Sequence, residues 1–427
     1  MKEVILPVKH PVKGIVSLPG SKSLVNRVLI LAALADGQSI ISNMLFSDDS
    51  IACLNALKAL GIVMDIDQAK REVQVIGCNH QFNVNLANVY CHDSGTVTRF
   101  LLPVCAAMKE LKFHFSASKR MSQRPLLSLL EVLIEQGCRI DYETHRHQMP
   151  FYLNANGLIG GDIFIPSVES SQFLSGLLMA SPLASNDVLI HTKAHKQLTY
   201  VDMTVDVMQH FGVAVERVLT QDSYRIKAHQ HYQGQNYTLE PDISTASYFA
   251  AAAALTNGHV LLEHVHENTL QGDIQFLNLL EQMGCHVEYH HQGVTVTGAK
   301  QLKGVNVNMA TFSDTFMTLA AIASFAQTKT QITGIGHTRL QESDRILAIS
   351  TELKKLGAKL ETTNDSITIY PSELHGAIVS GCGDHRIAMS LSLIGLRVAG
   401  VEITDSQCVA KTCPDYFHRL RRLTGES

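Results

Sequence analysis

The chain of 427 residues contains no tryptophan and no apolar run of the roughly 20 residues that a membrane-spanning helix needs. It also lacks a long basic run, and its formal net charge is only −4. We therefore expect neither nucleic acid nor a membrane surface as a partner. Met1-Lys2-Glu3 leads into a strand-like segment and not into a signal peptide, which favours a cytoplasmic protein.

The nine cysteines form no CxxC pair. An odd number of scattered cysteines argues against a disulfide framework and favours a reducing compartment. The chain also has no GxGxxG motif, and Gly20-Ser21-Lys22-Ser23 lacks the spacing of a phosphate-binding loop. We expect no nucleotide or other cofactor.

Histidine is abundant, with 21 residues, and several histidines lie close together in the sequence. Most of these groups alternate as His-x-His in polar strand or turn contexts, without the acidic or cysteine partners of a closed metal site. We interpret them as solvated side chains and expect no metal ion. The groups are His145 and His147, His229 and His231, His264 and His266, and His290 and His291.

A glycine that follows an apolar, helix-like run recurs six times, at an interval of roughly 72 residues. Each such glycine is typical of a helix C-terminus, because a residue without Cβ adopts the left-handed conformation at little cost. The repeat is too long for a common solenoid unit, so each copy should contain two helices and several strands. The glycines are Gly61, Gly137, Gly212, Gly284, Gly357 and Gly425.

A second, polar pattern keeps the same interval and precedes an apolar run each time. Small residues and carboxylates at these places predict helix N-termini, where they satisfy unpaired N–H groups. Helix N-termini also attract anions, so the pattern indicates an acidic substrate. The segments are Ser21-Lys22-Ser23, Asp93-Ser94-Gly95-Thr96, Ser170-Ser171-Gln172, Asp242-Ile243-Ser244, Ser313-Asp314 and Gly383-Asp384-His385-Arg386.

Apolar residues at three- and four-residue steps predict helices over 23–35, 50–60 and 125–136, with Pro125 in the first turn of the last. Short β-branched segments over 73–76 and 294–297 predict strands. The repeating unit is therefore expected to be α/β.

The length favours two domains, with three repeats in each. The third repeat ends near Gly234, so the domain change is expected around residue 238. We expect one domain over 21–238. The other should combine 1–20 with 239–427, so that the first strands of the chain join its last repeats.

Five motifs resemble those of the enolpyruvyl transferases, and among them the branch that acts on shikimate 3-phosphate. They cover the chain in order: Leu18-Pro19-Gly20-Ser21-Lys22-Ser23, Ser170-Ser171-Gln172-Phe173, Glu342-Ser343-Asp344-Arg345, Asp384-His385-Arg386 and Lys411-Thr412. The resemblance implies a two-domain inside-out α/β barrel of six βαβαββ units with an active site in the cleft between the domains. It also implies an enzyme of aromatic amino-acid biosynthesis that transfers the enolpyruvyl group of phosphoenolpyruvate to the 5-hydroxyl of shikimate 3-phosphate. We expect a monomer.

The resemblance assigns site residues to both anionic substrates, for which arginine forks suit phosphate and carboxylate groups. Those expected to hold phosphoenolpyruvate are Lys22, Gly95, Arg124, Gln172, Arg345, Arg386 and Lys411. Those expected to hold shikimate 3-phosphate are Lys22, Ser23, Arg27, Ser170, Ser171, Gln172, Tyr200, Asp314, His337 and Gln341. Asp314 and Glu342 are the expected acid and base, assisted by Lys22 as proton donor and electrostatic anchor.

The chain departs from the family pattern at five positions. The pattern often has Lys at Gln341, Asn at His337 and Asp93, Ser at Gln197, and Pro at Phe100. Three of these departures, at Gln341, His337 and Gln197, fall on the side of shikimate 3-phosphate, whereas the phosphoenolpyruvate side matches almost completely.

Three alternatives stay open at this point. The branch acting on UDP-N-acetylglucosamine has a cysteine in its reactive loop, but residues 116–125 contain none. A paralogue could use another cyclic alcohol as acceptor. A catalytically inactive anion-binding homologue is the third alternative, against which the intact Asp314, Glu342 and five cations argue.

Overall fold

A computed structural model of the chain describes residues 2–165, 171–192, 199–219 and 222–425. The chain divides into two compact units. We call Gly20–Leu239 the central unit, and Met1–Pro19 together with Glu240–Ser427 the terminal unit. Each unit is mixed α/β, as the sequence predicts.

The central unit contains three four-stranded sheets in the described part of the chain, with strand orders β10-β11-β13-β12, β14-β3-β5-β4 and β6-β7-β9-β8. Its strands are β3 (Gln38–Ser42), β4 (Val63–Asp67), β5 (Glu72–Ile76), β6 (Leu86–Tyr90), β7 (Lys109–Ser116), β8 (Arg139–Tyr142), β9 (Phe151–Asn156), β10 (Gly161–Phe164), β11 (Val188–His191), β12 (Val215–Val218), β13 (Ser223–Ile226) and β14 (Asn236–Thr238). Its helices are α1 (Lys22–Leu34), α2 (Asp48–Ala59), α3 (Gly95–Ala106), α4 (Lys119–Ser122), α5 (Leu127–Glu135), α6 (Ser171–Ala180), η1 (Ser181–Leu183) and α7 (Thr199–His210).

The terminal unit contains two four-stranded sheets, β16-β17-β15-β2 and β18-β19-β21-β20, and a three-stranded sheet, β1-β23-β22, among its described residues. Its strands are β1 (Lys2–Ile5), β2 (Lys13–Val16), β15 (His259–Glu263), β16 (His286–His290), β17 (Gly293–Thr297), β18 (Asn306–Asn308), β19 (Thr330–Thr333), β20 (Lys359–Thr362), β21 (Ser366–Tyr370), β22 (Ile378–Ser380) and β23 (Val401–Thr404). Its helices are α8 (Ile243–Thr256), η3 (Gly272–Ile274), α9 (Gln275–Gln282), η4 (Ser313–Thr315), α10 (Phe316–Ala323), η5 (Gly336–Leu340), α11 (Arg345–Lys355), α12 (His385–Gly395), η6 (Ser406–Lys411) and α13 (Tyr416–Thr424).

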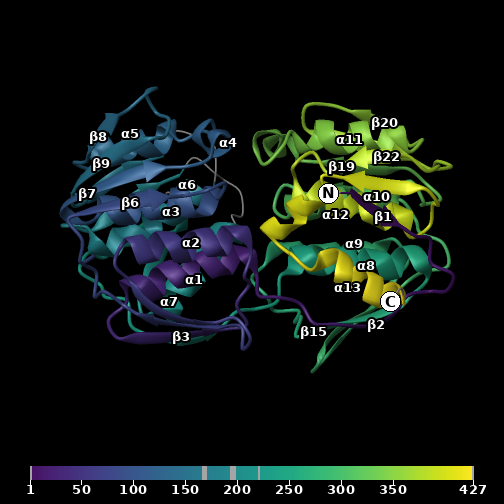
Figure 1. Cartoon of the computed structure of the whole chain (residues 1–427), viewed down its shortest axis with the longest axis horizontal. Coiled ribbons are helices and arrows are strands. Elements are labelled where there is room, and N and C mark those ends of the chain that lie inside the picture. The colour runs from purple at the N-terminus through teal and green to yellow at the C-terminus, as the bar shows by residue number, and fades with distance from the viewer. Residues whose placement is uncertain (1, 166–170, 193–198, 220–221, 426–427) are drawn as a thin grey trace. The chain divides into compact units, whose positions relative to one another are not determined.

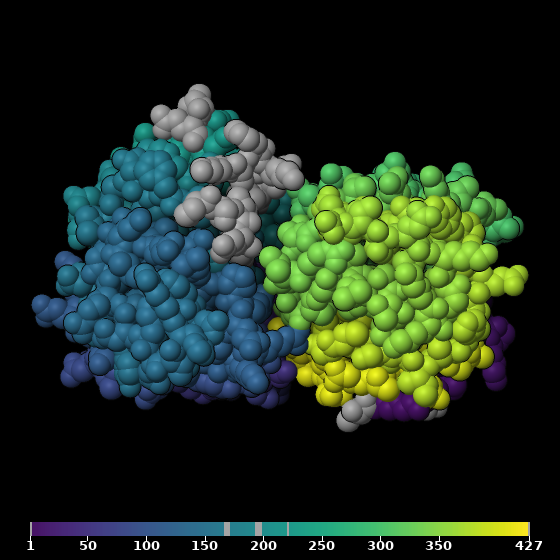
Figure 2. All heavy atoms as spheres, turned by 90° about the horizontal axis from the view of Figure 1, so that it is seen from above, coloured from purple at the N-terminus to yellow at the C-terminus, as the bar shows by residue number. Residues whose placement is uncertain are grey.

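Strand pairing repeats from sheet to sheet. In each four-stranded sheet one outer pair is parallel and the next two pairs are antiparallel, as in β6-β7-β9-β8. In the terminal unit β1 pairs with β23 and β2 pairs with β15, so the first residues of the chain lie beside its last repeats. Figures 1 and 2 both show the purple N-terminal residues of this unit next to its yellow C-terminal residues.

The core of each unit is made of helices enclosed by other elements. Every residue of α8 and of α12 is buried, and so is every residue of α1 after its first two. Figure 1 shows these helices between the sheets of their own units. Helices that are apolar all round must be covered on all sides, which places the sheets outside them.

The predicted helix ends are confirmed. Each of the six repeated glycines has a positive φ, from +74° at Gly425 to +102° at Gly137 and Gly284. Most helix starts also lie as predicted, with Ser94, Asp242 and Asp384 as N-cap residues whose side chains accept backbone N–H groups.

Two local predictions need correction. The helix α5 begins at Leu127, so Pro125 lies before its first turn. The Pro125 carbonyl lies outside the helix and accepts a hydrogen bond from Arg99. Ser313-Asp314 starts a 3-10 turn, and the α-helix follows from Phe316.

The strands expected over 73–76 and 294–297 are present as β5 and β17.

The paired histidines are solvated as predicted. His147 and His290 are half-buried and the remaining six are exposed: His145, His229, His231, His264, His266 and His291. All nine cysteines are free thiols. Among the helices that the structure describes, none has the length and apolar character that a membrane crossing requires.

Candidate active site

In the central unit, hydrogen bonds join the second turn of α1 to the first residues of α3 and to the first two turns of α7. Arg27, on the second turn of α1, donates to the Thr204 hydroxyl at 2.6 Å and to the Tyr200 carbonyl at 3.0 Å, both on α7. Asn26 donates to Thr96 at the start of α3 at 2.7 Å. The positive ends of these helix dipoles therefore meet, which suits an anion.

Arg27 is only 2% exposed, which the sequence did not indicate. Its hydrogen-bond acceptors are hydroxyl and carbonyl oxygens, and burial lowers its pKa to about 10. A buried cation with neutral acceptors stabilises an anion placed nearby. Arg27 thus joins the helices and supplies positive charge to their shared N-terminal end.

Arg99 positions Gln172 at the start of α6. Its Nη1 donates to Gln172 Oε1 at 2.8 Å, and its guanidinium lies over the Phe173 ring, 5.2 Å from the centroid. The Gln172 amide nitrogen is thereby turned away from Arg99. Sequence reasoning missed Arg99, because an arginine inside an apolar helix run carries no pattern of its own.

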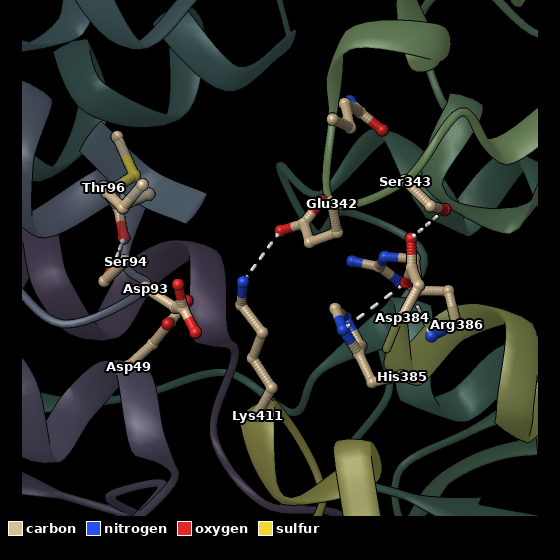
Figure 3. Close-up of polar contacts among 12 residues, drawn as sticks. Asp49, Asp93, Ser94, Thr96, Glu342, Ser343, Asp384, His385, Arg386 and Lys411 are labelled. Carbon is tan, nitrogen blue, oxygen red and sulfur yellow. Dashed lines mark hydrogen bonds and ion pairs between the residues drawn. The ribbon is translucent and has the colours of Figure 1, made fainter. Parts of the chain in front are cut away.

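The start of α3 offers an anion site next to an arginine. A Cβ on Gly95 would lie only 3.0 Å from Arg124 Nη1, so the absence of a side chain at Gly95 lets the guanidinium lie close to the start of α3. Ser94, the N-cap, shares a hydrogen bond of 3.1 Å with Thr96 (Figure 3). Asp93, one of the departures from the family pattern, accepts a hydrogen bond from the Ser118 hydroxyl.

Lys22 has a carboxylate partner that the sequence analysis did not name. Its Nζ lies 2.9 Å from Asp49 Oδ2, and the two side chains are 15% and 5% exposed. Asp49 is in the first turn of α2, where an acidic residue commonly interacts with the helix dipole. The sequence therefore carries no sign that Asp49 pairs with Lys22. Asp49 holds the ammonium group of Lys22 in place.

In the terminal unit, Arg345 lies at the centre of three carboxylates. Its nitrogens lie 3.0 Å from Asp314, 2.9 Å from Glu342 and 2.9 Å from Asp384. Burial alone would lower the pKa of Arg345, but the carboxylates, Asp384 above all, raise it beyond its ordinary value. Its Nη1 also donates to Oε1 of the Gln341 side-chain amide, a bond that a lysine side chain at that position could not accept.

Two more cations extend this arrangement. Arg386 Nη2 lies 2.7 Å from Asp314 Oδ2, and Lys411 Nζ lies 3.3 Å from Glu342 Oε1, as Figure 3 shows for Lys411. Asp314 and Glu342 thus each contact Arg345 and a second cation. We call Asp314, Glu342, Arg345, Asp384, Arg386 and Lys411 the Arg345 cluster.

The remaining predicted residues divide between the two units. His337 Nε2 lies 2.9 Å from the Ser313 hydroxyl, beside Asp314 in the chain. Ser23 and Ser171 are half-buried in the first turns of α1 and α6. Ser170 and Gln197 lie outside the described residues. In the parts of the chain that the structure describes, no group of three His, Cys, Asp or Glu side chains could hold a metal ion.

Each unit therefore gathers helix N-termini and basic side chains at one place, and the terminal unit adds paired carboxylates. This combination is that of an enzyme that binds anions and moves protons.

Comparison with known proteins agrees with this class. The sequence profile of the EPSP synthase (3-phosphoshikimate 1-carboxyvinyltransferase) family matches residues 7–420. The 3-phosphoshikimate 1-carboxyvinyltransferase of Nostoc punctiforme is 40% identical over 96% of both chains. The chloroplastic enzyme of that name from Arabidopsis thaliana is 37% identical over 99% of this chain and 84% of its own length. An EPSP synthase structure from Acinetobacter baumannii superposes with a TM-score of 0.86, with 26% identity over 99% of this chain and 98% of the other.

The chain belongs to the EPSP synthase family. This membership confirms the predicted class, a transferase of the shikimate pathway that makes aromatic amino acids, and the predicted enzyme type, a 3-phosphoshikimate 1-carboxyvinyltransferase. The substrates of the family are phosphoenolpyruvate and shikimate 3-phosphate.

Proposed function

We propose that this chain transfers the enolpyruvyl group of phosphoenolpyruvate to the 5-hydroxyl of shikimate 3-phosphate and releases phosphate. The observation that carries the proposal is the Arg345 cluster. It places two carboxylates, Asp314 and Glu342, within hydrogen-bond distance of three cations. Such a cluster can bind an anion and exchange protons with it at the same place.

The proposed binding roles follow the two units. Arg345, Arg386 and Lys411 of the terminal unit hold phosphoenolpyruvate, together with Lys22, Gly95, Arg124 and Gln172 of the central unit. Shikimate 3-phosphate is held by Lys22, Ser23, Arg27, Ser170, Ser171, Gln172 and Tyr200, and by Asp314, His337 and Gln341. The buried charge of Arg27 supports its proposed role in binding shikimate 3-phosphate. The hydrogen bond from Arg99, which orients Gln172, supports the proposed role of Gln172 toward both substrates.

The chemistry proceeds by addition and elimination. The 5-hydroxyl oxygen forms a bond to the enol carbon of phosphoenolpyruvate, its proton leaves to a base, and the methylene carbon receives a proton. The new methyl group then returns a proton, the carbon–oxygen bond to phosphate breaks, and the double bond re-forms. Asp314 and Glu342 serve as the proton carriers, and Lys22 assists as proton donor and electrostatic anchor. No covalent bond to the enzyme and no cofactor is needed.

The proposed architecture is a two-domain inside-out α/β barrel of six βαβαββ units, with the active site in the cleft between domains 21–238 and 1–20 plus 239–427. The recurring strand pairing and the enclosed helices α1, α8 and α12 support the repeat. We further propose a monomer, and a cytoplasmic location that is supported by the nine free thiols.

Phosphate release from phosphoenolpyruvate tests the reaction. We expect release that depends on shikimate 3-phosphate and is undetectable without it. Release that depends on another cyclic alcohol, while shikimate 3-phosphate has no effect, would contradict the acceptor assignment. Binding of both substrates without any release would instead indicate an inactive homologue.

Changing Arg124 to lysine is expected to raise KM for phosphoenolpyruvate by roughly tenfold and to leave KM for shikimate 3-phosphate little changed. The reason is that a point charge replaces a planar fork that can bind two oxygens at once. Steady-state kinetics with each substrate varied in turn measures both values. Arg120→Lys, in the short helix α4 that precedes Arg124, is the matched control, and an equal rise in that variant would contradict a specific role of Arg124.

A further inference from the structure

A buried carboxyl group lies next to the Arg345 cluster and is absent from the proposed site. Asp273, in the 3-10 helix η3, is 5% exposed. Its Oδ2 accepts a hydrogen bond from the Ser244 hydroxyl on the first turn of α8. Its Oδ1 is buried and has no hydrogen-bond partner in the described part of the chain. A buried carboxylate is stable only with full hydrogen bonding or a cation of its own, and Asp273 has neither.

The surroundings of Asp273 favour its neutral form. Burial and then the negative charge of Asp314 raise the pKa of Asp273 to about 7, and Asp242 adds to this rise. Arg386 and the hydrogen bond from the Ser244 hydroxyl act in the opposite direction and lower the pKa. Arg386 does not offset the effects of burial and of Asp314; its Nη2 bonds Asp314 Oδ2 at 2.7 Å, and Asp314 has Arg345 as a second cation. Among the described residues no cation forms an ion pair with Asp273, so Asp273 is the carboxyl group that holds a proton at moderate pH.

The charges that the neighbouring elements bring close to η3 come from Asp314 on η4 and from Asp242, the N-cap of α8. The titratable side chain of α8 is Tyr248, whose pKa is raised by burial, so it stays neutral. The titratable side chain of α9 is Glu281, exposed near the end of that helix. The 3-10 helix η4 contacts η3 and supplies Asp314 itself.

We propose that Asp273 is a positioning residue for Asp314. As a neutral acid it leaves Arg386 to Asp314, so that this carboxylate stays ionised and oriented. When Asp273 loses its proton, it competes for Arg386 and adds a negative charge beside the place where the anionic substrates bind. The inference rests on the proposed function of Asp314 and goes beyond it, because it assigns the protonation of the site to a group that does not touch substrate.

The pH dependence of kcat/KM tests the proposal. For the wild type we expect a decline above about pH 7, by up to roughly tenfold per pH unit, as expected for loss of one proton from the free enzyme. Asp273→Asn, which cannot ionise, should remove this decline or move it upward by at least about one pH unit. Ser244→Ala should shift it upward by less, because the hydroxyl bond favours the ionised form and its loss raises the pKa of Asp273.

Glu352→Gln is the matched control. Glu352 is also a buried carboxylate of the terminal unit, but it bonds Lys355 at 2.8 Å and is not part of the site. Its variant should keep the wild-type pH profile. A wild-type profile that is flat up to about pH 9, or coinciding profiles of wild type and Asp273→Asn, would overturn the proposal.

A direct titration separates this inference from the reaction. Carbon-13 NMR of the wild type labelled at aspartate carboxyls should show one carboxyl that titrates near pH 7, and Asp273→Asn should lack that signal. If the wild type releases no phosphate, the proposed function fails, yet this titration still decides the protonation of Asp273. A wild-type spectrum without an aspartate titrating above about pH 5 overturns the inference even if that variant does not fold.

Discussion

Changing Arg345 to methionine is expected to lower the free energy of unfolding by about 3–5 kcal/mol and to abolish turnover. The Arg345 side chain is 2% exposed and contacts Asp314, Glu342 and Asp384. Methionine has a similar volume but no charge. Three carboxylates, of which Asp384 is fully buried and Asp314 and Glu342 are half-buried, would then lose their common partner, and burying an uncompensated charge is among the most costly changes in a protein.

Urea or thermal unfolding followed by circular dichroism measures the decrease in the free energy of unfolding of the Arg345→Met variant. Lys354→Met is the matched control, because it makes the same kind of change on an exposed residue of the same helix, α11, and we expect no measurable effect. Arg345→Lys should fall in between, since it keeps the charge but cannot bond three carboxylates at once. A methionine variant as stable as the wild type would show that Arg386 and Lys411 are sufficient to hold the carboxylates.

Much of the local structure could be predicted because it depends on one residue at a time. The six repeated glycines have positive φ values since a helix that ends there needs a residue without Cβ. Asp242 and Asp384 cap helices since their side chains reach the next free N–H groups. Such signals survive in a single sequence.

The missing part of the site depends on which side chains meet across the fold. Asp49 follows Asp48 at the start of a helix, which is an ordinary place for an acidic residue, and only the structure shows that Lys22 lies 2.9 Å away. Asp273 belongs to none of the family motifs, and its importance arises from burial next to Asp314. Arg99 is an arginine in an apolar helix, and its partner Gln172 is far away in the sequence.

The departure at Gln341 also becomes interpretable in three dimensions. In this chain the side-chain amide oxygen of Gln341 accepts a hydrogen bond from Arg345, and because the amide is neutral it leaves the charge of Arg345 to the carboxylates. A lysine in its place would donate and would add a fourth cation to the cluster. The neutral amide is therefore compatible with the arrangement of Asp314 and Glu342.

Changing Asp314 to asparagine or Glu342 to glutamine is expected to reduce kcat by roughly 100- to 10,000-fold and to change both KM values by less than about tenfold. An amide keeps the shape of the carboxylate and one acceptor oxygen, but it cannot take up a proton. The structure also indicates that these two variants lose stability, although the amide has the shape of the carboxylate. Each carboxylate uses both oxygens for cations, Asp314 for Arg345 and Arg386 and Glu342 for Arg345 and Lys411, so the amide nitrogen must face a donor.

Stability and catalysis must therefore be measured together. Two facing donors leave a buried hydrogen bond unmade, which costs roughly 1–3 kcal/mol in the free energy of unfolding. Glu352→Gln makes the same change where the partner is Lys355, so it should lose comparable stability and keep its kcat. A loss of kcat in all three variants would attribute the effect to folding, and wild-type kcat in either site variant would refute its role as a proton carrier.

Deuterium exchange then assigns the two roles. In heavy water the wild type should place solvent deuterium in the methylene group of the product, because that carbon receives a proton and returns one. The variant that lacks the carboxylate next to the methylene still forms some product, and we expect that product to contain less deuterium per molecule than the wild-type product. The variant that lacks the base for the acceptor hydroxyl should turn over slowly but keep the wild-type label per product. Equal labelling per product in both variants would mean that neither carboxylate moves the methylene proton, and Lys22, held by Asp49, would then be the remaining donor.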